Sequence, residues 1–595
     1  PERKITVIGA GVGGNRVPDC QKRLERDVLT KEPTMVFIYI GINDVWHWNR
    51  DRGTTKDDFD LGLRDIIERL SASGARVILC TPTVIGEKTD GSNEFDSMLD
   101  EYSAISREVA ADTGSELLDL RAGFMDHLKA HNTDNVERGI LTTDSVHLNA
   151  AGNKKVADLM LGVLGVSPLK IKLPSIFSNH MVMQRGKPIR VWGKTTPGEN
   201  VHMMFGTVPA SATASDSGDW DVVFEARDAT FEPESLTVTC NGDTRTISGI
   251  LIGDVWVGSG QSNMAWPLSR TARGAEVIDA ANHPHIRLFH VPRVKANAPA
   301  DDIKAKWQTC SSANVSSFSA VLYHFGSRLH RDVSVPVGLI NSSWGGSAIE
   351  LWTANNGANA SMYNAMIAPL ANIAVKGCIW YQGETNVMQK NGMSYLDKKK
   401  ALVEGWRAHW GSRMPFYFVQ LAPWAGDKYE AGQLPALWEA QAATLTLPYT
   451  GMAVTTDIVH DIKDIHPNNK TDVGNRLARW ALAKTYGMEI EYSGPLFTRI
   501  KIEGQVARVY FAHALNLATR DGEALNEFQV AGADGMFADG NAEIDGETVL
   551  VSAEGVTPVE VRFGWHKLAN PNLVNGAGLP ASPFRSKNWQ GGDGL

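Results

Sequence analysis

Two stretches of this chain alternate short apolar runs with amphipathic segments, and this rhythm limits the possible fold more than any other feature. In the first stretch, apolar runs at 5–8, 35–40 and 76–80 are separated by helical patterns at 59–70, 102–111 and 154–164. In the second, apolar runs lie at 251–257, 337–341, 377–381, 416–421 and 452–456, and a helical pattern closes it at 472–484. Such alternation is typical of βαβ units around a parallel sheet. We therefore predict two α/β units.

Two other stretches have a different texture. Residues 167–250, and again the stretch after residue 490, show short Thr- and Val-rich runs broken by Gly, Pro, Asn and Asp turns, with almost no helical periodicity. This pattern favours small antiparallel β modules. The predicted order is an α/β domain at 1–166, a β module at 167–250, a second α/β domain at 251–490 and a β module at 491–595.

Charge and cysteine usage exclude several classes of partner. The chain has 58 basic and 67 acidic residues, a formal charge of -9, and no long run of either sign. We therefore expect no nucleic-acid partner and no membrane partner, since no apolar run is long enough to span a bilayer. The five cysteines are scattered without the spacing of a zinc site, so no metal and no cofactor is expected.

Four motifs in the second α/β unit could form an active site. Residues 251–264 run from an apolar strand into Gly-Ser-Gly-Gln-Ser, which places Ser262 where a helix begins. Residues 341–347 (Asn-Ser-Ser-Trp-Gly-Gly-Ser) and 380–386 (Trp-Tyr-Gln-Gly-Glu-Thr-Asn) follow two further strands, and residues 457–467 bring acidic side chains next to His466. Taken alone, Ser262 could be an ordinary helix cap. Because ligands bind at the carboxyl ends of parallel strands, the four motifs together favour a serine nucleophile with a histidine base.

In this order, the motifs resemble those of the sialate O-acetylesterase family, a branch of the SGNH hydrolases. The likeness extends over roughly residues 168–590, including Leu-Pro-Ser-Ile-Phe at 173–177 and Asn-Gly-Ala-Gly-Leu-Pro at 575–580. It implies three-layer, flavodoxin-like α/β domains with accessory β-sandwich-like modules. It also implies hydrolysis of sugar acetyl esters through an acetyl-serine intermediate, without a metal. Ser262 would attack and His466 would act as base, and the oxyanion would be bound by the backbone N–H groups of Ser262 and Gly346 and the side-chain amide of Gln382.

The acidic partner of His466 is less well defined by the sequence. SGNH enzymes commonly place Asp three residues before His, but that position is Lys463 here. We favour Asp464, with Asp461 and Asp457 as the other nearby carboxylates, and orientation of His466 by a backbone carbonyl is also open. Aromatic and polar residues near the motifs are the expected substrate contacts, each of which could equally be core: Trp266, Trp344, Trp352, Tyr381, Glu384 and Asn386.

The first α/β unit resembles a GDSL-type SGNH esterase. Residues 11–16 (Gly-Val-Gly-Gly-Asn-Arg), 41–44 (Gly-Ile-Asn-Asp) and 144–149 (Asp-Ser-Val-His-Leu-Asn) match three of the four blocks of that family. The likeness implies a second site with Gly14 and Asn43 as oxyanion donors and Asp144 and His147 as acid and base. The nucleophile block is absent, so the unit is either truncated, which we favour, or a relic. As it stands, we expect it to be inactive.

Two alternatives stay open. The chain could instead be an acetylxylan esterase or another plant-polysaccharide acetylesterase, because the same triad serves any acetylated sugar. Or it could be a non-catalytic carbohydrate-binding protein, since the β modules and the 17 tryptophans could supply stacking platforms. An acetylated carbohydrate is the expected partner in each enzymatic case. A periplasmic or secreted location is expected only from the kind of substrate.

Overall fold

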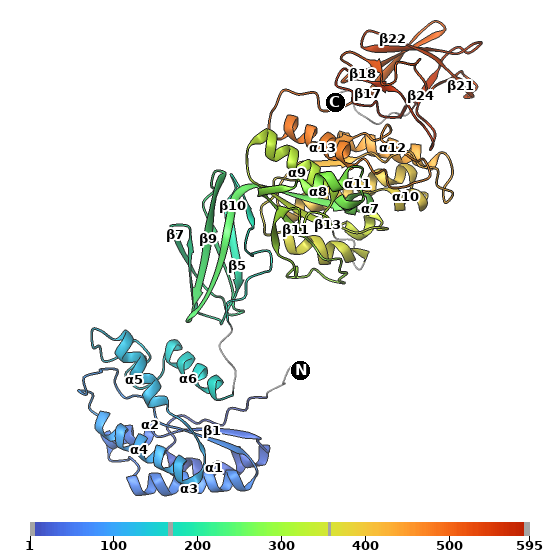
Figure 1. The fold of residues 1–595 in the computed structure, drawn as a ribbon. Coiled ribbons are helices and arrows are strands. Elements are labelled where there is room, and N and C mark those ends of the chain that lie inside the picture. Colours follow the sequence, from blue (N-terminus) through green and yellow to red (C-terminus); the bar gives the residue numbers. More distant parts are fainter. Residues whose placement is uncertain (1–5, 165–169, 355–358, 588–595) are drawn as a thin grey trace. The chain divides into compact units, whose positions relative to one another are not determined.

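The computed structural model describes residues 6–164, 170–354 and 359–587, and the chain divides into two compact units, 1–169 and 170–595. The first boundary lies three residues beyond the predicted one. Each unit is described separately below and is drawn in Figure 1. In the described part of the chain, no helix is both long and apolar enough to cross a membrane.

The first unit is an α/β unit with a short parallel sheet. Its strands pair in the order β1-β2-β3, all parallel. The strands are β1 (Met35–Tyr39), β2 (Arg76–Cys80) and β3 (Glu116–Leu118). The helices are α1 (Val17–Asp27), α2 (Ile42–Trp46), α3 (Lys56–Ala72), α4 (Asp96–Thr113), α5 (Leu120–His131) and α6 (Ala150–Val163).

One strand predicted for this unit is wrong. The described residues of the run 5–8 form no strand, and Val7 and Ile8 are exposed. An apolar run becomes a strand only where a neighbouring strand satisfies its backbone groups, and no strand pairs with residues 6–8.

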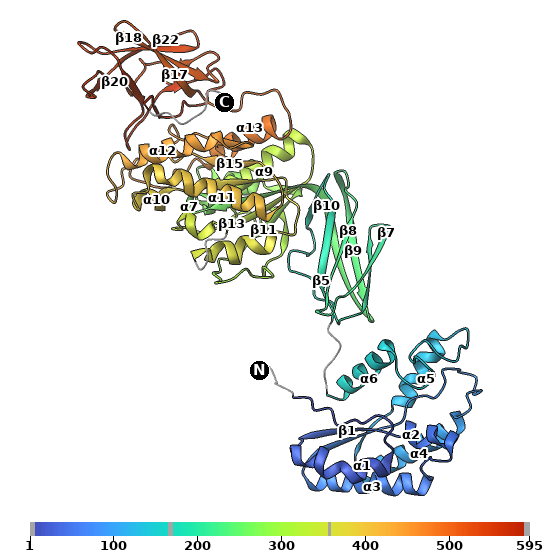
Figure 2. The same cartoon turned by 180° about the vertical axis from the view of Figure 1, so that it is seen from behind.

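The second unit begins with a β-rich part. Its strands are β4 (Val182–Gln184), β5 (Ile189–Lys194), β6 (Asn200–Phe205), β7 (Val208–Thr213), β8 (Asp219–Phe224), β9 (Thr230–Cys240) and β10 (Asp243–Gly260). Burial alternates strictly along β6 and β8, as expected for strands with one face on a core. Strand β10 pairs with β9 in its first half and with β13 and β14 in its second half. The predicted boundary at 250/251 therefore falls inside one continuous strand, which Figure 2 shows from behind.

The α/β part of this unit has the strand order β12-β11-β13-β10-β14-β15-β16. Its pairs are parallel, except that β12 is an antiparallel edge strand. The strands are β11 (Asn282–His290), β12 (Trp307–Ser311), β13 (Val337–Ser343), β14 (Gly377–Tyr381), β15 (Phe416–Val419) and β16 (Thr450–Ala453). The α-helices are α7 (Ser262–Ala265), α8 (Gly274–Asp279), α9 (Ala320–Val333), α10 (Glu384–Met388), α11 (Tyr395–His409), α12 (Gln433–Ala443) and α13 (Lys470–Lys484).

Aromatic side chains on alternating strand positions bind the helices to this sheet. Tyr417 packs near Trp480 of α13, while Phe416 packs against Trp406 of α11. Because neighbouring side chains of a strand point to opposite faces, α13 and α11 cover opposite faces of the sheet. The sheet is therefore buried on both sides, and only its edges and strand ends can carry a site.

The chain ends in antiparallel strands. They form two four-stranded sheets, β17-β18-β23-β22 and β21-β20-β24-β26, and the pair β19-β25. The strands are β17 (Leu496–Glu503), β18 (Val506–Ala512), β19 (Ala518–Thr519), β20 (Phe528–Ala531), β21 (Phe537–Asp539), β22 (Asn541–Asp545), β23 (Thr548–Ser552), β24 (Glu560–Phe563), β25 (Leu573–Val574) and β26 (Phe584–Arg585).

Candidate active site

Ser262 and His466 meet at the carboxyl end of the central strand β10. Ser262 is the first residue of α7, two residues after β10 ends, and His466 lies in the loop between β16 and α13. The Ser262 Oγ and His466 Nε2 atoms are 2.9 Å apart. This is hydrogen-bond distance between a hydroxyl and a base that could remove its proton.

The environment of His466 keeps its imidazole neutral. Burial is the largest influence and lowers the pKa of His466, and the charges of Lys470 and Arg270 lower it further, while Asp464 acts in the opposite direction. The ring of Trp266 stacks on the imidazole with centroids 4.5 Å apart and planes at 21°. A neutral, stacked imidazole can accept the Ser262 proton.

Of the three candidate carboxylates, Asp464 lies nearest to the base. Its Oδ1 atom accepts a hydrogen bond of 2.8 Å from the His466 backbone N–H and is 3.7 Å from Nδ1 of the ring. That second distance is too long for a hydrogen bond. Asp457 is paired with Arg476 through two bonds of 2.6 and 2.7 Å, and Asp461 accepts from the backbone of Lys463. The carboxylate near His466 is therefore Asp464, without the short ring contact of a Ser-His-Asp triad.

Two backbone N–H groups are available for an oxyanion beside Ser262. Gly345 is so close to Ser262 that an added Cβ would be 3.3 Å from the serine Cβ. Gly346 follows with φ +73 and open space around it. Among the described residues, no hydrogen-bond acceptor is found for the N–H group of Ser262 or for that of Gly346. These were the two backbone donors expected from the sequence.

Gln382, the third expected oxyanion donor, has a different role in the structure. The side chain is fully buried, and its Nε2 is 3.1 Å from Gln261 Oε1, 3.1 Å from the Ser347 carbonyl and 2.6 Å from Asn386 Oδ1. An amide has only two hydrogens, so none is left for an oxyanion. The prediction for Gln382 is therefore corrected: it holds together the turns after β10, β13 and β14.

Three of the expected sugar contacts lie inside the protein. Tyr381 and Asn386 are fully buried and Glu384 is 5% exposed, so none of them can touch a sugar. Asn386 accepts from the Ile349 backbone N–H and donates to Glu350, and Tyr381 ends strand β14 in the core. The sequence could not show this, because a residue at a strand end can point to either side. Trp352 is also fully buried.

The other two expected contacts belong to segments that reach the catalytic pair, since Trp266 stacks on His466 and Trp344 precedes Gly345, which lies against Ser262. Trp266 and Trp344 are each partly exposed. Arg270 lies over the ring of Trp266 at 5.7 Å and Lys295 over that of Trp344 at 5.5 Å, and both cations are exposed. The ring of Trp266, with Arg270 over it, therefore flanks the base.

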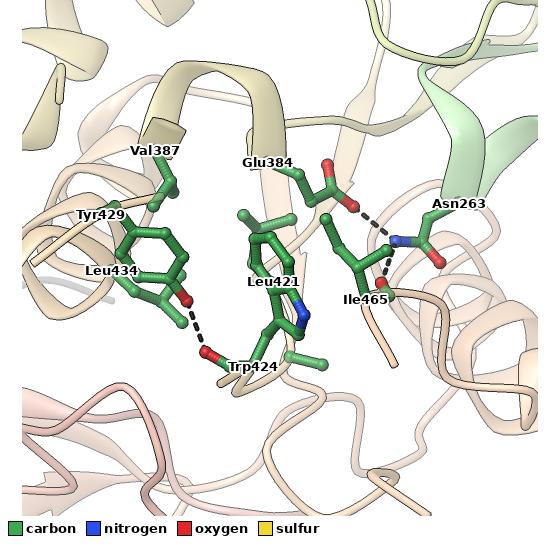
Figure 3. Close-up of a pocket in the computed structure, with 9 residues that line it drawn as sticks. Asn263, Glu384, Val387, Leu421, Trp424, Tyr429, Leu434 and Ile465 are labelled. Atoms are coloured by element: carbon green, nitrogen blue, oxygen red, sulfur yellow. Dashed lines mark hydrogen bonds between the residues drawn. The ribbon is translucent and has the colours of Figure 1, made fainter. Parts of the chain in front are cut away.

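Sequence reasoning missed Asn263 and Lys470. Asn263 donates to the Glu384 carboxylate and to the Ile465 carbonyl, and it accepts from the buried ammonium of Lys470. Figure 3 shows the Asn263 amide between Glu384 and Ile465, at a small pocket that Trp424 and Tyr429 also line. A signal for Lys470 existed, since a lysine opening a helix is opposed by the helix dipole.

The first unit brings its predicted site residues into two groups. His147 Nδ1 is 2.8 Å from Asp144 Oδ2, and the His147 ring meets Trp46 of α2 edge-on at 5.7 Å. Asn43, also on α2, donates to the Asn15 carbonyl next to Gly14. Hydrogen bonds from His147 lower the pKa of Asp144 to about 2. In the described part of the chain, no serine hydroxyl is bonded to His147.

Comparisons with known proteins agree with this geometry. The family model described as carbohydrate esterase, sialic acid-specific acetylesterase matches residues 252–483, and that of the GDSL-like lipase/acylhydrolase family matches residues 2–155. Human sialate O-acetylesterase is 30% identical over 389 residues, which cover 56% of this chain and 74% of that protein. An acetylxylan esterase from Geobacillus stearothermophilus is 31% identical over 173 residues, 28% of this chain and 74% of that protein.

A solved structure is also similar. The crystal structure of a carbohydrate acetylesterase from Xanthomonas citri is 38% identical with a TM-score of 0.68, and it covers 70% of this chain and 100% of that one. The similarity therefore includes more of this chain than its α/β part.

Proposed function

Because the chain belongs to the sialate O-acetylesterase family, we propose that it hydrolyses acetyl esters of carbohydrates, with Ser262 as nucleophile and His466 as base. The observation that carries this proposal is the 2.9 Å contact between Ser262 Oγ and His466 Nε2 at the carboxyl end of β10. A carbohydrate-binding protein without activity has no need of a serine hydroxyl held on a neutral imidazole.

The proposed reaction has two halves. Ser262 Oγ attacks the ester carbonyl carbon while His466 takes the serine proton, and the Ser262 and Gly346 N–H groups bind the oxyanion. When the tetrahedral intermediate collapses, the sugar oxygen leaves with the proton from His466, and the acetyl group stays on Ser262. Water then attacks the acetyl-serine with His466 as base, which releases acetate and restores the hydroxyl.

The test is acetate release together with trapping of the nucleophile. We expect the chain to release acetate from O-acetylated sugars, and a small organophosphonate to stop this by modifying Ser262, as located by peptide mass spectrometry. Binding of glycans without acetate release would instead support the carbohydrate-binding alternative.

For the substrate we propose an acetylated acidic sugar over acetylated xylan. Arg270 is exposed over the ring of Trp266, which stacks on His466, so it puts a positive charge beside the catalytic pair that suits a carboxylate near the acetyl ester. We expect a higher kcat/KM on O-acetylated sialic acid than on acetylxylan, and a loss of that preference in Arg270→Gln. Equal rates on both substrates, or no effect of Arg270→Gln, would favour the acetylxylan alternative.

The pH dependence follows from the environment of His466. The imidazole accepts the serine proton only when neutral, and burial lowers its pKa from the ordinary 6.5. Activity is therefore lost as pH falls through this lowered pKa. We expect the acid limb of the kcat/KM profile below pH 6.5. A limb above that value would show that another group is titrating.

Replacing Asp464 by asparagine is expected to cost only about tenfold in kcat. Loss of the aspartate in a Ser-His-Asp triad costs about 10⁴ because the carboxylate binds the imidazole directly, whereas here Oδ1 is 3.7 Å from Nδ1. The Asp464 charge raises the His466 pKa, so Asp464→Asn should also move the acid limb to lower pH. The control is Asp461→Asn on the same loop, which should change neither kcat nor the pH of the acid limb. A 10⁴-fold loss would show that Asp464 binds the imidazole during turnover.

We further propose a periplasmic or secreted location, because acetylated glycans are met outside the cytoplasm. Fractionation of the native host with an antibody to this chain tests it, and recovery in the cytoplasm alone would contradict it.

A further inference from the structure

Lys470 is a fully buried lysine next to the Ser262–His466 pair. It opens helix α13, four residues after His466, and its side chain is 0% exposed. Burial of an ammonium group costs free energy, and a positive charge is also unfavourable at a helix N-terminus. Neither burial nor the position in the helix favours a lysine here. The reason for it must therefore lie in the contacts of its side chain.

The hydrogen bonds of Lys470 lead to both members of the catalytic pair. Its Nζ donates to Asn263 Oδ1, and the other end of that amide donates to the Ile465 carbonyl at 3.0 Å and to Glu384. Asn263 follows Ser262 in the chain, and Ile465 precedes His466. One amide therefore joins the neighbour of the nucleophile to the neighbour of the base, and Lys470 fixes which way that amide points.

A second contact leads to the imidazole through an aromatic ring. Lys470 Nζ is 5.9 Å from the ring centre of Trp266, and this ring also stacks on that of His466. It is also 5.4 Å from the ring centre of Tyr381. Cations within about 6 Å of an aromatic ring are attracted to its face. Lys470 thus contacts the ring that supports the base.

We propose that Lys470 is a positioning residue that holds His466 in reach of Ser262, through Asn263 and Trp266, and keeps the imidazole neutral before the attack. Such a residue is needed because Asp464 does not hydrogen-bond the ring nitrogen Nδ1 of His466 and so does not orient the imidazole. The inference rests on the proposed function of the same site and adds a residue that touches neither the substrate nor the reacting atoms.

The charges around Lys470 support this role. Burial lowers the pKa of Lys470 to about 7, and it outweighs the charges of Glu384 of α10 and Asp464 of the His466 loop, which raise this pKa. Glu384 is itself buried, with a raised pKa, and its Oε2 has no hydrogen-bond partner among the described residues. The positive charge of Lys470 lowers the pKa of His466, in the same direction as Arg270 and against Asp464.

The decisive variant is Lys470→Met, which keeps length and volume but removes the charge. We expect kcat to fall up to about a hundredfold, as for a small misplacement of a catalytic group, with KM little changed. The acid limb of kcat/KM should move to higher pH, since His466 loses a nearby positive charge. Lys484→Met, on the exposed end of the same helix, is the matched control and should change neither quantity.

Asn263→Ala separates the effect of the Asn263 hydrogen bonds from the effect of the Lys470 charge on His466. It removes the link to Ile465 but keeps the Lys470 charge, so we expect a lower kcat with an unmoved acid limb. Because both substitutions break one network, the double variant should lose less than the product of the two single losses. Should Lys470→Met fail to fold, Lys470→Gln retains a polar head, and the same changes in kcat and acid limb are expected.

Labelling of Ser262 by a small organophosphonate distinguishes this inference from the proposed function. The labelling rate needs no sugar substrate, so a wild-type chain that is labelled but cleaves no acetylated sugar refutes the function and leaves the role of Lys470 standing. A Lys470 variant with wild-type labelling rate, kcat and pH profile overturns the inference. A variant that only lowers Tm, with unchanged kcat per labelled site, also overturns it, because the role is then purely structural.

Discussion

Alanine in place of Ser262 is expected to reduce acetate release from acetylated sugars by about 10⁶-fold, as loss of the nucleophile does in other serine hydrolases. The substitution removes the only oxygen within hydrogen-bond distance of His466 Nε2 among the described residues. The backbone N–H groups of residue 262 and Gly346 remain, so binding and a small residual rate should persist. Acetate is measured by a coupled assay at saturating substrate, with Tm recorded for each variant.

A serine three residues earlier, near the end of β10, provides the control. Ser259 is fully buried, and its hydroxyl has no hydrogen-bond partner in the described structure, so Ser259→Ala removes no interaction. We expect Ser259→Ala to keep wild-type acetate release. If Ser262→Ala retained activity as well, the nucleophile would be another serine. If wild type and both variants bound glycans equally without any turnover, the chain would be a carbohydrate-binding protein.

The sequence predicts the fully buried strands of the second unit better than the strands that are partly polar. The second half of β10 and the strands β13, β14 and β15 are buried on both faces, so each appears as a largely apolar run. Strand β11 begins with Asn-His-Pro-His and was not predicted, because its first half lacks that apolar signal. A run of apolar residues indicates a fully buried strand, whereas β11 is defined by its pairing with β12 and β13.

The same distinction applies to the candidate site. Ser262 and His466 could be chosen from their motifs because the end of a parallel strand places them at one edge of the sheet. The 3.7 Å between Asp464 and the His466 ring, and the burial of Tyr381, depend on loop and side-chain conformation. Motif spacing carries no information about either. Lys470 was missed for a related reason, since its role appears only when residues 263 and 465 are seen side by side.

Alanine in place of Gly260 is expected to have the largest effect on stability, because three turns of the site converge on this residue. An added Cβ would lie 2.1 Å from the Tyr381 carbonyl oxygen. That oxygen cannot move away, since it accepts the Gln261 N–H at 3.0 Å, and Tyr381 is paired with Gly260 in the β10–β14 register. The Gly260 carbonyl in turn accepts the Trp344 N–H at 3.0 Å, which ties down the turn that carries Gly346.

We therefore expect Gly260→Ala to destabilise the second unit by more than about 4 kcal/mol, the range reserved for severe steric conflicts in a core. The control is Gly411→Ala, which also has positive φ (+57) but no atom within 4 Å of the added Cβ, so it should cost only about 1–2 kcal/mol. Thermal unfolding of the full chain checks both, and because residues 1–169 form a separate compact unit, their transition should stay in place. Equal melting of the two variants would mean that backbone conformation, rather than the contact with Tyr381, requires glycine at 260. A large loss of stability for Gly260→Ala alone would show that the turns carrying Ser262 and Gly346 depend on one close approach between β10 and β14. Only glycine fits at this approach.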